Sequence, residues 1–198
     1  MGERLAAEAP VEADLVLPIP DSGTPAAIGF SRASGIPFSE GLIKNRYVGR
    51  TFIQPEQGMR EQGIRMKFNP LAEVAGKRVV AVDDSIVRGN TTRQIVQMLF
   101  DAGAAEVHVR VSAPPVIGQC FYGMDFANPD ELLAGRLGST DEVCAYIGAT
   151  SLAYLSLEGL IESTRRPRSA LCAACLTGEY PAPIPHGHAK LRFEPVTS

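Results

Sequence analysis

The sequence has no run of apolar residues that approaches the roughly 18 needed to span a membrane. The segment from Met1 to Pro20 also lacks the charged-then-apolar layout of a signal peptide, so we expect a cytoplasmic protein without membrane contact. Basic residues are not in excess: 19 Lys and Arg stand against 22 Asp and Glu, and the cations are scattered. This argues against nucleic-acid binding, and a site for an anionic ligand must be built locally from loops.

Two common phosphate-binding motifs are absent as well. Neither the Gly-Lys-Ser/Thr ending of a Walker A loop nor the spaced glycines of a GxGxxG fingerprint occurs. Cysteine is scarce, with four residues, and structural disulfides are not expected, so metal ligation, redox chemistry and plain burial stay open for them. The 198 residues suffice for one sizeable core. We assign residues 1–180 to a single domain and residues 181–198 to a Pro-rich extension that wraps the surface or is disordered.

The most informative stretch that the sequence does contain is residues 79–92. Four β-forming residues lead into Asp83 and Asp84, a loop of small and hydroxylated residues follows, and residues 93–100 have helical spacing. A loop that opens a helix in this way can aim backbone N–H groups and the helix dipole at one phosphate. The carboxylates would repel a phosphate, but they can accept hydrogen bonds from sugar hydroxyls and hold a divalent cation. The predicted ligand is a phosphorylated sugar; the alternative, commoner for an isolated acidic pair, is an ordinary helix N-cap region.

Repeated strand and helix patterns predict the fold. The predicted strands are residues 14–19, 77–82, 106–112 and 151–155, and the predicted helices are 2–13, 91–102, 130–137, 140–147, with Thr140 as cap, and 157–164. This order predicts an α/β protein with a mostly parallel sheet flanked by helices. Because residues 106–112 alternate between apolar and polar, we expect that strand nearer the sheet edge, with His108 on the exposed side.

Two loops accompany these units. Residues 20–25 form a Pro/Asp/Ser/Gly/Thr loop after the first strand, which is either an anion-binding loop or a turn with Ser22 as N-cap. Residues 36–69 are polar and have no sustained period, and we interpret them as a flexible lid. Cations on a closing loop would neutralise an anionic ligand and exclude water, and the alternative is a solvated basic loop. The cations of this segment include Lys44, Arg46, Arg50, Arg60, Arg65 and Lys67.

Residues 79–92 resemble the 5-phosphoribosyl 1-pyrophosphate (PRPP) signature of type I phosphoribosyltransferases, and residues 82–89 resemble the glutamine PRPP amidotransferases in particular. The resemblance continues through residues 41–53 and 120–125 and ends near 172–178, so it covers nearly all of the chain. It implies a type I phosphoribosyltransferase fold with a flexible lid. It also implies that PRPP and ammonia give 5-phosphoribosylamine and pyrophosphate, the first step of de novo purine synthesis.

The resemblance implies roles for individual residues. Mg2+ would be placed by Ser22, Asp83 and Asp84, and Lys44, Tyr47 and Arg50 would be the catalytic lid residues that close over the leaving group. Asn90 stands where the family more often has Thr, which exchanges a hydroxyl for an amide that can still bond a phosphate. The residues that would bind PRPP are Asp21, Ser22, Gly23, Thr24, Asp83, Asp84, Ser85, Ile86, Val87, Arg88, Gly89, Asn90, Thr91 and Thr92.

The cysteines and the family's usual length leave several points open. Some amidotransferases hold a [4Fe-4S] cluster, and Cys120, Cys172 and Cys175 match three of its four thiolates, whereas the fourth lies before the point where this chain begins. Empty, oxidised or zinc-filled sites and a purely structural role are the alternatives, and Cys144 is interpreted as core packing. The family's glutaminase domain, which derives ammonia from glutamine, is also absent here, so the chain is either a fragment or the transferase half of a split system.

The resemblance further implies a homo-oligomer inhibited by purine nucleotides. Two other functions remain open at this point. One is a non-catalytic PRPP or nucleotide sensor, or a partner subunit of a separate glutaminase, because a fold does not fix an activity. The other is a salvage phosphoribosyltransferase, although no segment resembling a base-binding hood is found. The complete lid segment favours catalytic turnover over sensing.

Overall fold

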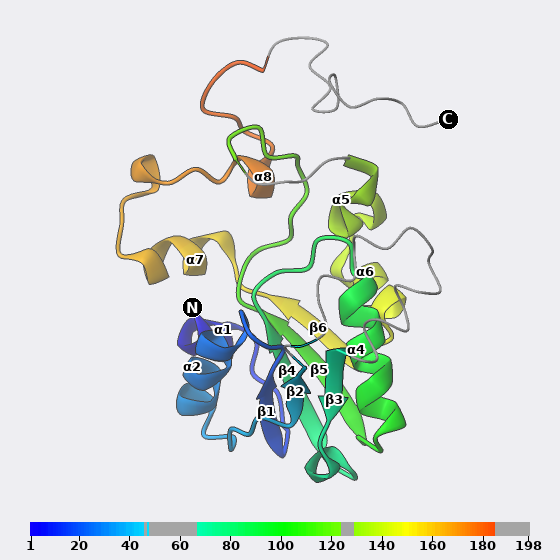
Figure 1. The fold of residues 1–198 in the computed structure, drawn as a ribbon. Coiled ribbons are helices and arrows are strands. Elements are labelled where there is room, and N and C mark those ends of the chain that lie inside the picture. Colours follow the sequence, from blue (N-terminus) through cyan, green and yellow to red (C-terminus); the bar gives the residue numbers. More distant parts are fainter. Residues whose placement is uncertain (46, 48–66, 124–128, 185–198) are drawn as a thin grey trace, which may run out of the picture.

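The core of the structure is a parallel β-sheet with helices on both faces (Figure 1). A computed structural model of the chain describes residues 1–45, 47, 67–123 and 129–184. The sheet has four strands in the order β1 (Leu15–Pro18), β4 (Arg78–Asp83), β5 (Glu106–Val111) and β6 (Ser151–Tyr154), all parallel. The predicted mostly parallel α/β sheet is confirmed.

Two hydrophobic cores lie on opposite faces of this sheet. Helices α1 (Gly2–Glu8) and α2 (Thr24–Ser34) cover one face, and α4 (Asn90–Asp101) and α6 (Thr140–Ile147) cover the other (Figure 1). Successive residues of β4 alternate between them: Val80 and Val82 pack with α1 and α2, whereas Val79 and Ala81 pack with α4 and α6. Burial on both faces explains why β4 is a continuous apolar run.

Short elements surround the sheet. A separate antiparallel pair, β2 (Leu42–Lys44) and β3 (Phe68–Pro70), is followed by the 3-10 turn η2 (Ala72–Val74). The other elements are η3 (Pro129–Glu131), α5 (Leu133–Leu137), α7 (Leu157–Thr164), η4 (Arg168–Ala170) and α8 (Ala174–Thr177). None of the helices in the described part of the chain has the length and hydrophobicity needed to cross a membrane.

The structure corrects several expected details. The first helix ends at Glu8 rather than 13, because Pro10 lacks the N–H that a continuing helix needs. The predicted helix 130–137 is divided into η3 and α5, with extended Leu132 between them. The cap of α6 is Ser139, not Thr140: the Ser139 hydroxyl accepts a hydrogen bond from the Glu142 N–H.

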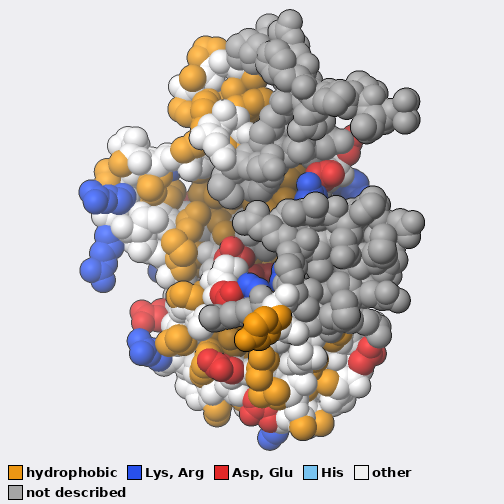
Figure 2. Space-filling model, viewed as in Figure 1, with side chains coloured by type: hydrophobic (Ala, Val, Ile, Leu, Met, Phe, Trp, Pro, Cys, Tyr) orange, Lys and Arg blue, Asp and Glu red, His pale blue; other side chains and the backbone are white. Residues whose placement is uncertain are grey.

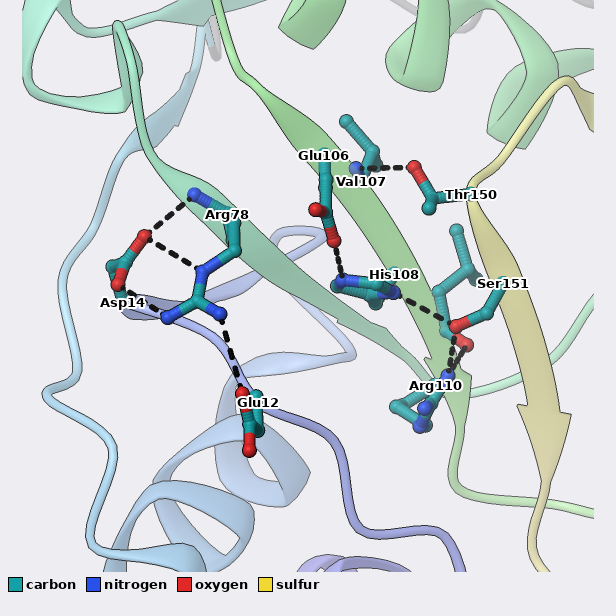
Figure 3. Close-up of polar contacts among 10 residues, drawn as sticks. Glu12, Asp14, Arg78, Glu106, Val107, His108, Arg110, Thr150 and Ser151 are labelled. Atoms are coloured by element: carbon teal, nitrogen blue, oxygen red, sulfur yellow. Dashed lines mark hydrogen bonds and ion pairs between the residues drawn. The ribbon is translucent and has the colours of Figure 1, made fainter.

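The position of β5 was also predicted wrongly. This strand lies between β4 and β6, and His108 is only 6% exposed instead of lying on the surface. The polar residues of β5 are hydrogen-bonded within the protein. His108 Nε2 contacts Glu106 Oε2 at 2.8 Å, and His108 Nδ1 contacts Ser151 Oγ at 2.9 Å (Figure 3). Polar residues in a strand therefore mark a buried network here, not an edge.

Two predictions concern residues that the structure does not describe. The predicted lid, residues 36–69, contains strand β2 near its start and the first residues of β3 at its end, whereas Arg46 and residues 48–66 lie outside the described residues. Most of the C-terminal extension, residues 185–198, lies outside them too. The lid and the domain boundary at residue 180 stay predictions.

Candidate functional site

The candidate site lies where β1 and β4 end side by side. Pro18 pairs with Val82, and the Ile19 N–H donates to the Val82 carbonyl at 2.8 Å, so the loops that follow both strands meet at one sheet edge. Gly23 marks the closest approach, since a Cβ on it would lie 2.3 Å from the Val82 carbonyl oxygen. The loop of residues 20–25 thus lies directly beside the acidic pair. The two segments are close enough to contact one ligand together.

The two neighbouring carboxylates have different surroundings. Asp83 is the last residue of β4 and is 8% exposed, and its Oδ1 accepts a hydrogen bond from the Asp84 N–H at 2.8 Å. Burial, and then the adjacent Asp84 carboxylate, raise the pKa of Asp83 well above its usual range. Asp84 is exposed to solvent. The pair therefore combines one buried acid that supports the loop with one exposed acid that can reach a ligand.

The loop from Ser85 to Gly89 is anchored at both ends. Ile86 is buried, and the Val87 carbonyl accepts a hydrogen bond from the Leu133 N–H at 2.8 Å. Gly89 adopts φ 75°, and a Cβ there would lie 2.3 Å from Leu133 Cδ2, so both the backbone conformation and the space require glycine. Contacts within the protein therefore define the shape of this loop.

Helix α4 begins at the end of this loop. Among the described residues no side chain caps its N-terminus, so the N–H groups of the first turn, which includes Asn90, Thr91 and Thr92, have no capping acceptor. Thr92 is buried, whereas Asn90 is exposed. An uncapped helix start beside an exposed carboxylate can bind the phosphate of a sugar phosphate while the acid receives its hydroxyls.

Several predicted residues are engaged in ion pairs. Lys44, on β2, reaches the loop after β1 and contacts Asp21 Oδ2 at 2.6 Å through Nζ. Arg88 contacts Glu131 Oε2 at 2.6 Å through Nη2. Figure 2 shows acidic and basic side chains side by side in the middle of the face that contains this edge. A bound phosphate or pyrophosphate would compete with Asp21 and Glu131 for these cations.

Of the other two predicted catalytic lid residues, the structure describes Tyr47 alone. The Tyr47 side chain is fully exposed, at 101%, and its backbone N–H donates to Asn45 Oδ1. Arg50 lies outside the described residues. A catalytic role for Tyr47 and Arg50 stays a prediction.

The cysteine segments lie together, away from this edge. The N–H groups of Ile117 and Gly118 both donate to the Cys175 carbonyl at 2.9 Å, which ties the chain before Cys120 to α8. Burial raises the pKa of the Cys175 thiol, and the thiols of Cys120 and Cys172 raise it further. Among the described residues, however, no three His, Cys, Asp or Glu side chains are placed to hold a metal ion. The iron–sulfur ligation stays a prediction that this arrangement does not support.

The fourth cysteine has a separate environment. Cys144 is partly buried in α6, its Sγ donates to the Ala149 carbonyl at 3.4 Å, and burial raises the pKa of its thiol. This position fits the packing role expected for it.

One residue at the site was not predicted from the sequence. The Tyr146 hydroxyl donates to Asn90 Oδ1 at 2.9 Å, which links α6 to the start of α4. Nothing in the pattern of residues 140–147 signals this contact, because it depends on how α6 packs against α4. The sequence could have shown only that Tyr146 lies on a helix near the predicted site.

The sheet and the two loops at its edge define a phosphoribosyltransferase-type α/β domain. The Phosphoribosyl transferase domain family matches residues 3–116, more than half of the chain, and the chain belongs to this family. Among curated proteins it is 58% identical over 201 residues to the amidophosphoribosyltransferase of Synechococcus elongatus, with 100% of this chain and 41% of the relative covered. It is 55% identical to that of Archaeoglobus fulgidus, covering 93% of this chain and 41% of the relative.

Solved structures agree with these relatives. The glutamine PRPP amidotransferase of B. subtilis, complexed with ADP and GMP, matches with a TM-score of 0.84 and 53% identity, covering 94% of this chain and 42% of that chain. A structure described as the allosteric regulatory enzyme of purine biosynthesis matches equally, with a TM-score of 0.84 over 94% of this chain and 41% of that chain. The chain thus spans about two fifths of the length of the proteins it matches.

Proposed function

We propose that the chain binds PRPP at the shared edge of β1 and β4 and, with ammonia, forms 5-phosphoribosylamine and pyrophosphate. The observation that carries this proposal is the exposed Asp84 between the uncapped start of α4 and the loop after β1. Its relatives named amidophosphoribosyltransferase support the choice of reaction. The chain would perform the transferase part of that reaction, and a glutaminase would supply the ammonia.

The first requirement of the reaction is to hold the two charged ends of PRPP. In this proposal the first-turn N–H groups of α4 and the loop of residues 85–92 bind the 5-phosphate. Asp83 and Asp84 receive the ribose hydroxyls. The loop of residues 21–24 binds the pyrophosphate through backbone N–H groups, with Ser22 near the metal. The anchoring of both loops to the sheet supports these roles, since a preorganised site loses less entropy on binding.

The residues present fit a magnesium ion that is shared with the substrate. Carboxylate and hydroxyl oxygens are the ligands that Mg2+ prefers, and it usually binds through one or two carboxylates together with substrate oxygens and waters. Asp84, with Asp83 and Ser22, would hold it here. When bound, Mg2+ neutralises charge on the departing pyrophosphate.

The chemical step is a displacement at carbon 1 of the ribose. The nitrogen lone pair of ammonia forms the new C–N bond while the C–O bond to pyrophosphate breaks, and the pyrophosphate leaves with the bonding electrons. The nitrogen then releases one proton to solvent, which gives the amine. Positive charge develops on the ring in the transition state, so holding the ring and excluding water are the main tasks of the protein. Lys44 would leave its ion pair with Asp21 and contact the pyrophosphate instead. Tyr47 and Arg50 would also contact the pyrophosphate when the lid closes.

Three wider features belong to the same proposal. Purine nucleotides are expected inhibitors, which the complex of the B. subtilis relative with ADP and GMP supports. A homo-oligomer is expected from the family resemblance, and a cytoplasmic location from the sequence pattern. The source of ammonia would be a glutaminase domain or subunit.

The test is pyrophosphate release from PRPP measured with and without Mg2+ and ammonium. We expect release that requires both, and a loss of about 100-fold in Asp84→Ala, because the ring and the metal lose an exposed ligand. Asp141→Ala, which removes an exposed acid from the first turn of α6, is the matched control and should keep full activity. Tight PRPP binding without any pyrophosphate release would instead identify a sensor.

A further inference from the structure

Tyr146 lies against the proposed phosphate loop in a fixed position. Its hydroxyl donates to Asn90 Oδ1 at 2.9 Å, and its Cε1 would be 3.3 Å from a Cβ placed on Gly89. Guanidinium carbons of Arg93 and Arg136 lie 5.4 and 5.8 Å from the centre of its ring. The tyrosine is therefore held at its hydroxyl, at its edge and by two cations.

The hydrogen bond from Tyr146 uses the oxygen end of the Asn90 amide. An asparagine side chain carries an acceptor oxygen and an NH2 group with two donors, and a phosphate can use only the donors. Tyr146 occupies the oxygen, while in the described part of the chain the NH2 group has no acceptor. Since Asn90 is exposed at the first residue of α4, its donors can add to the N–H groups of the helix start.

We propose that Tyr146 is a positioning residue that turns the Asn90 amide so that its NH2 group, not its carbonyl, binds the 5-phosphate of the ligand. This inference rests on the proposed function, because it assumes that the start of α4 is the phosphate site. Without the tyrosine hydroxyl, the Asn90 oxygen would lose the partner that holds the side chain while its NH2 group binds the phosphate. Arg93 and Arg136 add positive potential beside the same loop.

The proposal concerns position 90, where this chain has asparagine and the family that it resembles more often has threonine. A threonine at position 90 would carry its own hydroxyl donor, whose orientation needs no partner from α6. An asparagine needs its amide to be oriented, and Tyr146 supplies that orientation. The effect of Tyr146 should consequently depend on the residue at position 90.

Calorimetry with ribose 5-phosphate and with inorganic pyrophosphate tests this prediction. Tyr146→Phe keeps the ring and removes only the hydroxyl, and we expect roughly tenfold weaker binding of ribose 5-phosphate, a typical loss for a bond to a charged group. Pyrophosphate binding should not change, which a general loss of structure would not allow. Asn90→Asp, which keeps an acceptor for Tyr146 but replaces the donors by an oxygen, should lose ribose 5-phosphate binding.

The double variant separates positioning from packing. With Asn90→Thr already present, adding Tyr146→Phe should leave ribose 5-phosphate binding unchanged, so the two effects are not additive. Equal tenfold losses in both backgrounds, or no loss in Tyr146→Phe alone, would overturn the inference while leaving the proposed function intact. If the unmodified chain bound neither ribose 5-phosphate nor pyrophosphate, the proposed function itself would fail.

Discussion

A network of polar side chains lies on the face of the sheet that α1 and α2 cover (Figure 3). Arg78 contacts Asp14 through Nη2 at 2.9 Å, and this pair lowers the pKa of Asp14 to about 2. Arg110 is 5% exposed, and burial lowers the pKa of its guanidinium, which donates to the Ala9 carbonyl and to Ser151 Oγ. Each buried polar group in this network has a partner, so the network fixes the register of β5 against β6 and the loop after α1.

His108 is the histidine of this network, and its surroundings make the stability of the fold depend on pH. Burial lowers its pKa from the usual value, Arg110 and Arg78 lower it further, and Glu106 opposes them. The unfolded chain therefore takes up the proton before the folded one as the pH falls below about 6.5. We expect the free energy of unfolding to fall with pH below that value, until the pH passes the lower pKa of the folded state.

Urea unfolding of the unmodified chain and of His108→Gln at about pH 7.5 and about pH 5.5 checks this prediction. The variant should lose stability at both pH values, but its additional loss on acidification should be smaller. The comparison of the two proteins is needed because Asp83 has the opposite effect on stability. Its pKa is raised in the folded state, so this group makes the fold less stable as the pH rises above the pKa of the unfolded chain. Asp83 acts equally in both proteins, so the difference between their pH slopes reports on His108. Identical pH slopes in both proteins would contradict the prediction.

At the scale of elements, features that depend on the local sequence could be predicted, whereas features that depend on tertiary contacts could not. Helix α7 and strand β4 were predicted to within one residue, since amphipathic spacing and a long apolar run are properties of the local sequence. The order of the strands is not local, which is why β5 was placed at the edge although it lies inside the sheet. Patterns that predict an element do not say which neighbour covers its polar face.

The same distinction applies to the candidate site. The acidic pair and the loop after β4 were predicted as one unit, because a strand, a loop and a helix follow each other in the sequence. The contacts of Tyr146 with Asn90 and of Lys44 with Asp21 join residues that are far apart in the chain. Lys44, Asp21 and Asn90 were named from the sequence, but these contacts could be found only after the elements had been packed together.

Close packing between elements makes Gly23 a test of the site's geometry. In Gly23→Ala the new methyl group would meet the Val82 and Ile19 carbonyl oxygens, so the loop after β1 must move away from β4. We expect a loss of about 1–3 kcal/mol in stability and clearly weaker PRPP binding by calorimetry, since the two loops would no longer share one edge.

Gly35→Ala is the matched control at the other end of α2. Gly35 adopts φ 76° with open space around its Cβ position, so alanine there costs roughly 1 kcal/mol of backbone strain without moving the loop. It should lower stability and keep PRPP affinity. If Gly23→Ala bound PRPP as tightly as this control does, the two loops would not form one site.

At the scale of the whole molecule, one sheet connects the two loops of the proposed site. The loops after β1 and β4 belong to a sheet whose two faces are both packed, so moving either loop disturbs a core. The chain spans about two fifths of its relatives' length, yet the described elements bury a core on each side of the sheet. We therefore expect the chain to fold and to bind PRPP with Mg2+ as it stands.

Thermal unfolding with and without ligand tests that expectation on the whole chain. A ligand that binds only the folded state at about 100 times its Kd adds about 2.7 kcal/mol of stability, which corresponds to a rise in Tm of roughly 5–10 °C for a chain of this size. PRPP with Mg2+ should produce this shift, and Asp84→Ala should abolish it while keeping the Tm of the unliganded chain. Because ammonia is only a reactant in the proposed chemistry, adding it without PRPP should leave the Tm unchanged. A shift of equal size in Asp84→Ala would mean that PRPP binds elsewhere on the molecule.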